Sequence, residues 1–180
     1  MNRTYEVNKQ EKTVGSDKVK NMVIVAVLIA LTFVFTNINV QLPFGGKGGL
    51  VHLGNIPVFI GAIIYGKKTG AIAGGIGMAA FDLFSGWTLW APFTLVTVSL
   101  MGYVTGAIAE KRPSTIMNIV GMLAALVIKI VGYYIAEAVI YGNWITPVLS
   151  IFGNVLQVGT AIVVVAIVAP QLKKAANSIR

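Results

Sequence analysis

The chain has 180 residues, of which 56% are hydrophobic and only 11% are charged, and its formal net charge is +8. A soluble domain carries roughly 25% charged residues and could not shield so much apolar surface, so the composition excludes one and predicts an integral membrane protein. The sequence contains no cysteine and a single histidine, which excludes a disulfide scaffold, a cysteine nucleophile and an ordinary zinc site.

The basic residues lie in short groups that separate long apolar stretches. They precede residue 21, follow residue 172 and form two internal pairs, Lys67-Lys68 and Lys111-Arg112, while Lys47 and Lys129 stand apart. Short cytoplasmic loops of multi-pass membrane proteins carry such an excess of Lys and Arg, so the pattern predicts that both chain ends are cytoplasmic. A nucleic-acid-binding protein would instead need a contiguous basic face, which the sequence does not indicate.

In chain order, the sequence predicts an all-α membrane protein, a compact bundle of six transmembrane helices. Residues 1–20 are polar and lack the apolar core of a signal peptide, so we expect a disordered cytoplasmic tail there. The helical membrane domain is expected over residues 21–170, and a second cytoplasmic tail over residues 171–180. The six helices are expected at about residues 21–38, 52–65, 69–85, 90–109, 115–141 and 147–169.

The second of these helices is short for a full crossing of the bilayer, which takes about 20 residues. A stretch rich in Gly and Pro, residues 39–51, precedes it and is expected to be an external loop. Residues 45–49 read Gly-Gly-Lys-Gly-Gly but lack the spacing of a phosphate-binding loop. The sequence therefore indicates no ATP-binding motif, and no cofactor is expected.

Small residues spaced four apart indicate where helices approach closely, because small side chains let two backbones come together. The third and fourth helices each carry one glycine pair, Gly70 with Gly74 and Gly102 with Gly106. We interpret these pairs as packing inside the bundle. Ala26 and Ala30 form a similar pair in the first helix, whose other apolar residues are bulky, so that pair could instead receive a helix of another protein.

Three ionisable residues fall inside predicted helices, where charge is costly and an ionisable side chain is a functional candidate. They are Asp82, Lys129 and Glu137. Helix direction places Asp82 about one turn from the outer end of its helix and Glu137 in the outer third of the fifth helix. Residues spaced four apart follow one face of that fifth helix: Lys129, Tyr133, Glu137 and Tyr141.

Other polar and aromatic residues are expected near the same depth, towards the outer helix ends: His52, Asn55, Trp87, Trp90, Trp144, Asn154 and Gln157. Carboxylates, amides and aromatic rings at one depth are typical of a small-molecule site, which we predict on the external side. Each group has an alternative role. The tryptophans fit an interfacial belt, Asp82 and Lys129 a structural ion pair, His52 a solvated loop, and the two amides inter-helix hydrogen bonds.

These residues leave three classes of function open. A transporter without an ATP-binding motif needs an ion gradient or a partner ATPase, and six short helices without an inverted repeat favour the partner. An intramembrane enzyme would use Asp82 and Glu137 as acid and base. A membrane scaffold would bind partners and no small molecule.

Several segments, in order and spacing, resemble the substrate-binding S components of energy-coupling factor (ECF) vitamin transporters. They are residues 50–57 (Leu-Val-His-Leu-Gly-Asn-Ile-Pro), 65–71 (Tyr-Gly-Lys-Lys-Thr-Gly-Ala), 73–77 (Ala-Gly-Gly-Ile-Gly), 82–83 (Asp-Leu), 90–94 (Trp-Ala-Pro-Phe-Thr) and 150–157 (Ser-Ile-Phe-Gly-Asn-Val-Leu-Gln). The resemblance covers about residues 21–170. It implies a six-helix subunit, not an enzyme, that captures a vitamin or vitamin precursor from outside. It also implies partners: a transmembrane coupling (T) protein and two cytoplasmic ATPase subunits.

The resemblance further assigns roles to parts of this chain. Ala26 and Ala30 match an alanine pair that meets the coupling protein in the family, and residues 39–51 match a loop that gates the site. Hydroxymethylpyrimidine-type and pyridoxine-type members are the most similar. Asp82 or Glu137 would accept hydrogen bonds from an aminopyrimidine stacked on tryptophan, whereas Lys129 would suit an anion such as pantothenate, and the choice stays open.

Overall fold

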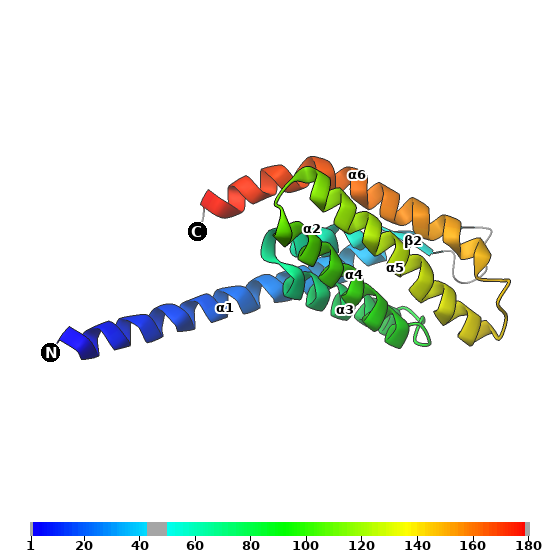
Figure 1. The fold of residues 1–180 in the computed structure, drawn as a ribbon. Coiled ribbons are helices and arrows are strands. Elements are labelled where there is room, and N and C mark those ends of the chain that lie inside the picture. The colour runs from blue at the N-terminus through cyan, green and yellow to red at the C-terminus, as the bar shows by residue number, and fades with distance from the viewer. Residues whose placement is uncertain (1, 43–49, 179–180) are drawn as a thin grey trace.

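The structure, a computed structural model, describes residues 2–42 and 50–178. This part of the chain forms six α-helices and one pair of short strands, which confirms the expected all-helical class (Figure 1). The elements are α1 (Asn2–Asn37), β1 (Asn39–Gln41), β2 (Leu50–His52), α2 (Asn55–Tyr65), α3 (Lys67–Phe84), α4 (Ala91–Lys111), α5 (Thr115–Tyr141) and α6 (Val148–Ser178).

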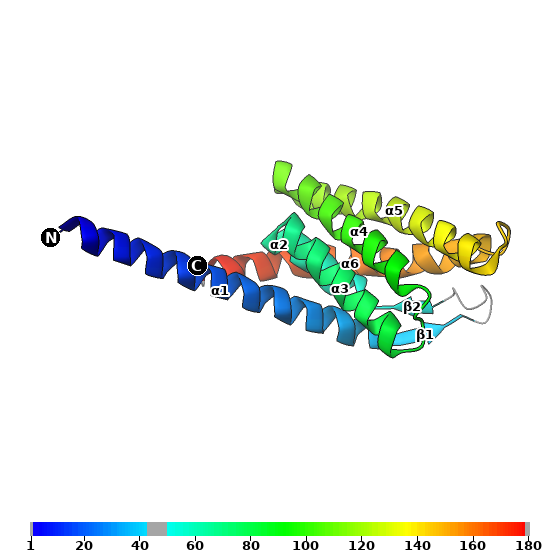
Figure 2. The same ribbon diagram turned by 90° about the horizontal axis from the view of Figure 1, so that it is seen from below.

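Successive helices run in opposite directions along one bundle (Figures 1 and 2). Both chain ends, the α2–α3 turn and the α4–α5 connection lie at one end of it. The opposite end, called the hairpin end below, holds β1, β2 and the α3–α4 and α5–α6 connections. The topology therefore gathers the basic pairs Lys67-Lys68 and Lys111-Arg112 at the end that holds both termini.

Four helices within the described residues are long and apolar enough to cross a membrane: Asp17–Asn37 of α1, Ala91–Lys111, Thr115–Tyr141 and Val148–Ala176 of α6. Helix α2 is apolar but has only 11 residues. Large apolar side chains such as Val127, Val139 and Val163 are exposed on the outer faces, as suits a protein surrounded by lipid. Six crossings, with both termini cytoplasmic, stay a prediction.

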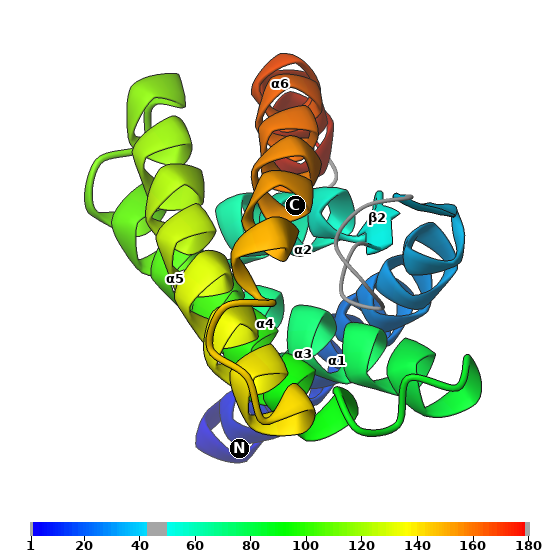
Figure 3. The ribbon, with the colours of Figure 1, turned by 90° about the vertical axis from the view of Figure 1, so that its right-hand side faces the viewer.

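Helix α2 lies at the centre of the bundle and packs against α1, α3, α4 and α6 (Figure 3). Its Val58 and Phe59 are fully buried. They belong to a core cluster with Met78 of α3, Met101 of α4 and Val158 of α6. A short helix that is buried on this scale is stabilised by packing, which explains how it forms without the length of a full crossing.

Close packing of α3 on α4 depends on the glycines that the sequence singles out. A Cβ atom on Gly106 would lie 2.6 Å from the backbone nitrogen of Lys67, and one on Gly102 would overlap the backbone of Gly70. On the opposite side of α3, a Cβ atom on Gly70 would lie 2.7 Å from the Cα of Ala62. The glycine pairs therefore pack inside the bundle, as expected, and bring three backbones into direct contact.

Local chemistry sets several helix ends. The side chain of Ser114 caps α5 by accepting a hydrogen bond from the backbone N–H of Met117, at 3.2 Å. Helix α5 ends at Tyr141 and is followed by Gly142, whose φ of 62° lies in the left-handed region that glycine tolerates. Pro92 stands in the first turn of α4, where no backbone donor is needed.

Two helices are longer than the sequence predicts. Helix α1 begins at Asn2, where we expect a disordered tail over residues 1–20, and α6 runs on to Ser178 through Pro170. No proline precedes Pro43, so nothing in the covalent chain interrupts α1, and a single interior proline removes one hydrogen bond without ending α6. The cytoplasmic placement of both terminal segments stays a prediction.

Two short strands lie between α1 and α2. Strands β1 and β2 pair antiparallel, with Asn39 opposite His52 and Gln41 opposite Leu50. Helix α2 therefore begins at Asn55 rather than at residue 52. Residues 43–49, within the predicted external gating loop 39–51, lie outside the described residues, and the gating role stays a prediction.

Candidate functional site

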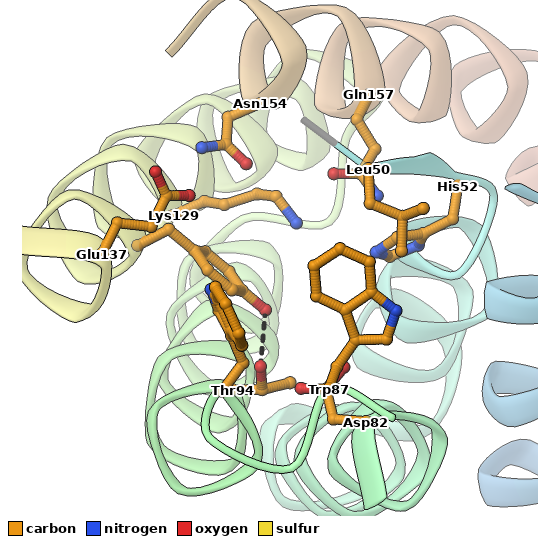
Figure 4. A pocket seen from close by; sticks show the side chains of 11 residues that line it. Leu50, His52, Asp82, Trp87, Thr94, Lys129, Glu137, Asn154 and Gln157 are labelled. Atoms are coloured by element: carbon orange, nitrogen blue, oxygen red, sulfur yellow. Dashed lines mark hydrogen bonds between the residues drawn. The ribbon is translucent and has the colours of Figure 1, made fainter. Parts of the chain in front are cut away.

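A small cavity opens at the hairpin end between α3, α4, α5, α6 and β2, and Figure 4 shows side chains converging on it from each of these elements. This inner cavity has a free volume of about 40 Å³. It is lined by Leu50, His52, Asp82, Trp87, Trp90, Thr94, Lys129, Tyr133, Glu137, Asn154 and Gln157. The residues that the sequence analysis groups near one depth are all among them except Asn55, Tyr141 and Trp144.

One face of α5 supplies the central part of the inner cavity. Lys129, Tyr133 and Glu137 follow each other at four-residue spacing, so all three point the same way. The Lys129 side chain is 1% exposed, and its Nζ lies 4.8 Å from the centre of the Tyr133 ring. Glu137 is held by the Ser150 hydroxyl of α6, which donates to Oε2 at 2.7 Å. The cavity therefore contains a buried ammonium group on an aromatic face beside an anchored carboxylate.

Helices α3 and α4 supply the other side. The Tyr133 and Thr94 hydroxyls are hydrogen-bonded at 3.0 Å (Figure 4). Asp82, in the last turns of α3, has a buried Oδ2 without a hydrogen-bond partner, and the same holds for Nε2 of Gln157 on α6. Buried polar atoms are nearly always paired in folded proteins, so these two are available to a ligand.

The alternative of an ion pair between Asp82 and Lys129 is not supported. Among the described residues, the salt bridge that the structure shows joins Lys67 Nζ to Glu110 Oε2, at 2.8 Å. That bridge links α3 to α4 far from the cavity. Asp82 and Lys129 thus line one cavity and form no salt bridge with each other in the described part of the chain.

His52 faces the cavity from β2 and is buried, with 9% of its surface exposed, so it is not a solvated loop residue. Its Nδ1 accepts a hydrogen bond from the backbone N–H of Gly54 at 3.2 Å. Burial lowers the pKa of His52 well below its ordinary value of 6.5, and the charge of Lys129 lowers it further. The imidazole is therefore neutral, and Nε2 carries the proton as a donor.

Aromatic rings form the outer wall of the cavity. Trp87 and Trp90 meet edge to face with ring centres 5.3 Å apart. Trp90 meets Tyr141 in the same manner at 5.9 Å. Trp144 is different: it is 61% exposed and lies outside the cavity, which favours its alternative role in an interfacial belt.

Asn55, Ala26 and Ala30 also lie away from the cavity. Asn55, in the first turn of α2, is fully buried, and neither of its side-chain polar atoms has a partner. It is absent from the cavity lining, so its predicted contact with substrate has no geometric support. Ala26 and Ala30 are exposed on the outer face of α1, where a partner helix could reach them.

The sequence analysis missed two lining residues, Leu50 and Thr94. Thr94 follows Trp90 by four residues, and that spacing could have revealed it, because Trp90 directly precedes α4 and Thr94 lies one turn further on. Leu50 depends on the β1–β2 pairing, for which the sequence carries no clear signal. No group of three or more His, Cys, Asp or Glu side chains in residues 2–42 and 50–178 could hold a metal ion.

One family model and two known proteins match most of this chain. Residues 16–174 match the family model described as ECF-type riboflavin transporter, S component. The thiamine precursor transporter HmpT of Lactococcus lactis subsp. cremoris (strain MG1363) is 24% identical over 163 residues, 91% of this chain and 93% of HmpT. An uncharacterized protein of Pyrococcus woesei is 26% identical over 129 residues, 72% of this chain and 86% of that protein.

Two solved structures share the fold. The S component of a bacterial ECF transporter superposes with a TM-score of 0.75 at 20% identity, covering 91% of this chain and 99% of that one. ThiT from Listeria monocytogenes superposes with a TM-score of 0.72 at 16% identity, covering 88% of this chain and 97% of ThiT.

Proposed function

This chain belongs to the family of ECF-type riboflavin transporter S components, and from that premise we propose that it captures a thiamine precursor, an aminopyrimidine such as hydroxymethylpyrimidine, for ATP-driven uptake. The similarity to HmpT supports this substrate class. The observation that carries the proposal is the pair of unpartnered polar atoms in an aromatic-walled cavity, Asp82 Oδ2 and Gln157 Nε2. S components are substrate-binding subunits and not enzymes, so an acid–base role for the carboxylates is not proposed.

An aminopyrimidine matches these two atoms chemically. Hydroxymethylpyrimidine carries an amino donor on one edge of its ring and a ring-nitrogen acceptor on the opposite edge. Asp82 and Gln157 approach the cavity from opposite sides (Figure 4), so Asp82 would accept from the amino group while Gln157 donates to the ring nitrogen. The ring would stack on the Trp87 or Trp90 indole, and Nε2 of His52 would add a donor.

Cavity size also supports a single-ring substrate. A water-sized group occupies roughly 10–15 Å³ of such free volume, so 40 Å³ corresponds to about three such groups, and even a single ring needs the lining side chains to move apart. The three fused rings of riboflavin, the vitamin in the name of the family model, would require much larger rearrangement.

Lys129 favours a second candidate substrate. Its buried ammonium group faces the cavity, and no ion pair to it is seen in the described part of the chain. A carboxylate ligand such as pantothenate would pair with it, whereas pyridoxine would use its ring hydroxyl and its two hydroxymethyl groups. These ligands differ in whether they donate a hydrogen bond to Asp82, whose carboxylate stays unpaired when the ligand is an anion.

A ligand screen on the detergent-purified chain tests the proposal. Hydroxymethylpyrimidine, pyridoxine, pantothenate and riboflavin are compared by thermal unfolding and titration calorimetry. A ligand at 100 times its Kd should stabilise the fold by about 2.7 kcal/mol, and we expect this for hydroxymethylpyrimidine. If pantothenate alone binds, the proposed substrate becomes an anion and no longer an aminopyrimidine. If none of the four ligands binds, the proposal that the chain captures a vitamin precursor is contradicted.

The transport cycle is proposed from family membership. We propose that the end bearing both termini and the basic pairs faces the cytoplasm and that the inner cavity opens outwards. A transmembrane coupling protein and two ATPases would then supply the energy, and the exposed pair Ala26 and Ala30 would contact the coupling protein.

A further inference from the structure

Another cavity lies at the opposite end of the bundle from the inner cavity, where both chain ends are found (Figure 1). This terminal cavity has a free volume of about 290 Å³. It is formed by α2, the α4–α5 connection, the start of α5 and the last part of α6, and is lined by Ile63, Pro113, Ser114, Thr115, Asn118, Ala169, Pro170, Lys173 and Lys174. Neither the family match nor the proposed capture of a vitamin precursor assigns it a role.

The charges around the terminal cavity have one sign. Lys173 and Lys174 line it, no acidic residue does, and the basic pair at positions 111–112 directly precedes its lining residues on the α4–α5 connection. Within residues 2–42 and 50–178, the structure pairs neither of these two lysines with a carboxylate, whereas Lys67 is paired with Glu110 at 2.8 Å. The positive charge of the cavity is therefore available to an anionic ligand.

Uncharged hydrogen-bonding side chains line the same cavity. Thr115 and Asn118 belong to the first turns of α5, and Ser114 directly precedes that helix. The Ser114 oxygen accepts a hydrogen bond from the backbone N–H of Met117 at 3.2 Å, so its own O–H remains free to donate. Two hydroxyl groups and an amide thus stand with two ammonium groups, a set of donors that suits the oxygens of a phosphate group.

Apolar surface adjoins these polar groups. Ile63 and Ala169 are buried members of the hydrophobic core, and they form an apolar wall of the terminal cavity. Further towards the middle of the bundle, Ile116 and Val120 of α5 and Ile167 of α6 are exposed. A free anion gains nothing from this apolar surface, whereas acyl chains would bury it. The combination of cations and apolar surface therefore favours an amphiphile over a free anion.

We propose that the terminal cavity binds an anionic phospholipid, with the phosphate of the headgroup at Lys173 and Lys174 and the acyl chains along α5 and α6. Basic pockets between transmembrane helices bind anionic headgroups in this way. The positive-inside pattern accounts for lysines at this end of the bundle, but it does not bring them together with hydrogen-bond donors in one cavity. The proposal does not depend on the identity of the transported substrate.

Lipid retention by the full detergent-purified chain tests this. Native mass spectrometry compares bound phosphatidylglycerol and phosphatidylcholine, which have the same acyl chains here and differ in the charge of the headgroup. The double variant Lys173→Gln/Lys174→Gln removes the two cations, and Asn118→Leu removes a hydrogen-bonding group at unchanged charge. The matched control is Lys18→Gln/Lys20→Gln, which removes the same charge from α1, outside the lining of the terminal cavity.

We expect the wild-type chain to retain phosphatidylglycerol in preference to phosphatidylcholine. Lys173→Gln/Lys174→Gln should bind phosphatidylglycerol at least about tenfold more weakly, because each lysine near a headgroup contributes to the attraction. Asn118→Leu should weaken the same binding by a smaller factor. The control double variant should change it less than about twofold.

Two results would overturn the lipid site and leave the proposed function untouched. One is equal retention of the two lipids by the wild-type chain. The other is equal weakening in the two double variants, which would mean that net charge alone attracts the lipid. Inorganic phosphate separates a lipid from a free anion: it should displace no more phosphatidylglycerol than chloride does at the same ionic strength, and selective displacement by phosphate would show a site for a free phosphate anion instead.

Discussion

Asp82 links a single buried atom to the proposed binding of substrate. Its Oδ2 has neither solvent nor a hydrogen-bond partner, and leaving a buried polar group unpaired costs about 1–3 kcal/mol. The free protein therefore retains a defect that a donor on the ligand would remove. Gln157 carries the complementary defect, an amide nitrogen without an acceptor.

Replacing Asp82 by asparagine tests this interpretation. Asp82→Asn keeps the shape of the side chain but removes its charge, so we expect hydroxymethylpyrimidine affinity to fall about 10- to 100-fold, the equivalent of one lost charged hydrogen bond. The unfolding temperature of the free chain should stay the same or rise. Calorimetry and thermal unfolding measure the two effects, with Glu110→Gln as a control carboxylate far from the cavity. If Asp82→Asn binds hydroxymethylpyrimidine with unchanged affinity, the carboxylate of Asp82 does not contact the ligand.

The neutral state of His52 predicts a pH-dependent stability. Its pKa is lowered in the folded chain, so the unfolded chain binds a proton first as the pH falls below 6.5. The stabilisation from neutral His52 is complete above pH 6.5 and is lost as the pH falls towards the folded-state pKa. One proton changes the free energy of unfolding by at most about 1.4 kcal/mol per pH unit.

Thermal unfolding of wild type and His52→Gln at pH 7.5, 6.5 and 5.5 measures this contribution of His52 to the free energy of unfolding. The charged groups that share the cavity with His52, namely Lys129 of α5, Asp82 of α3 and Glu137 of α5, remain in both proteins. The difference between the two proteins therefore isolates the imidazole, and we expect wild type to lose stability relative to the variant as the pH falls. A constant difference would show that His52 is not held neutral by the fold.

The residues of the inner cavity could largely be predicted because charge is rare inside apolar helices. Asp82, Lys129 and Glu137 stand out against their surroundings, and helical spacing adds Tyr133. Asn55 shows where this reasoning stops: it is polar and near the right depth, but the direction of its side chain follows from the packing of α2. Leu50 is apolar and reaches the cavity only through strand pairing, so its sequence context carries no signal.

At the scale of the helix, the contact between α3 and α4 is set by residues without side chains. Where glycine brings two backbones together, even one methyl group is too large. Gly102→Ala should destabilise the bundle by about 1–3 kcal/mol, as overpacking does in other cores, because the new Cβ would overlap the backbone of Gly70.

Gly159→Ala in α6 is the matched control for this contact, since a Cβ atom there would meet nothing within 4 Å. Alanine is the better helix former by roughly 0.5–1 kcal/mol, so this variant should be as stable as wild type or more so. Unfolding temperatures of both variants in one detergent decide the point. Equal stability of the two would mean that α3 and α4 do not approach as closely as described.

Helices were predictable as elements because long apolar stretches and basic loops delimit them, and α5 agrees with the expected range from Thr115 to Tyr141. The β1–β2 pair was not predictable, since strands of three residues are too short to show an alternating pattern. The start of α1 was missed for a different reason: residues 2–20 are polar, and polarity was interpreted as disorder although no proline interrupts the helix.

For the whole molecule, the arrangement places the two proposed tasks on different parts of the bundle. The inner cavity lies at the hairpin end, while Ala26 and Ala30 lie on the outer face of α1, outside the lining of that cavity. Substrate capture and coupling to a partner should therefore be separable by mutation.

Ala30→Leu makes this separation measurable, because it places a bulky side chain where a partner helix would need a small one. We expect the purified variant to bind hydroxymethylpyrimidine with wild-type affinity, while ATP-dependent uptake in cells that supply the coupling protein and ATPases falls at least about tenfold. Val127→Leu, on an exposed face of α5, adds bulk elsewhere on the outer surface and should leave both activities unchanged. If Ala30→Leu abolishes ligand binding, the alanine pair supports the fold of the bundle; if uptake persists at the wild-type rate, the coupling protein docks on another face.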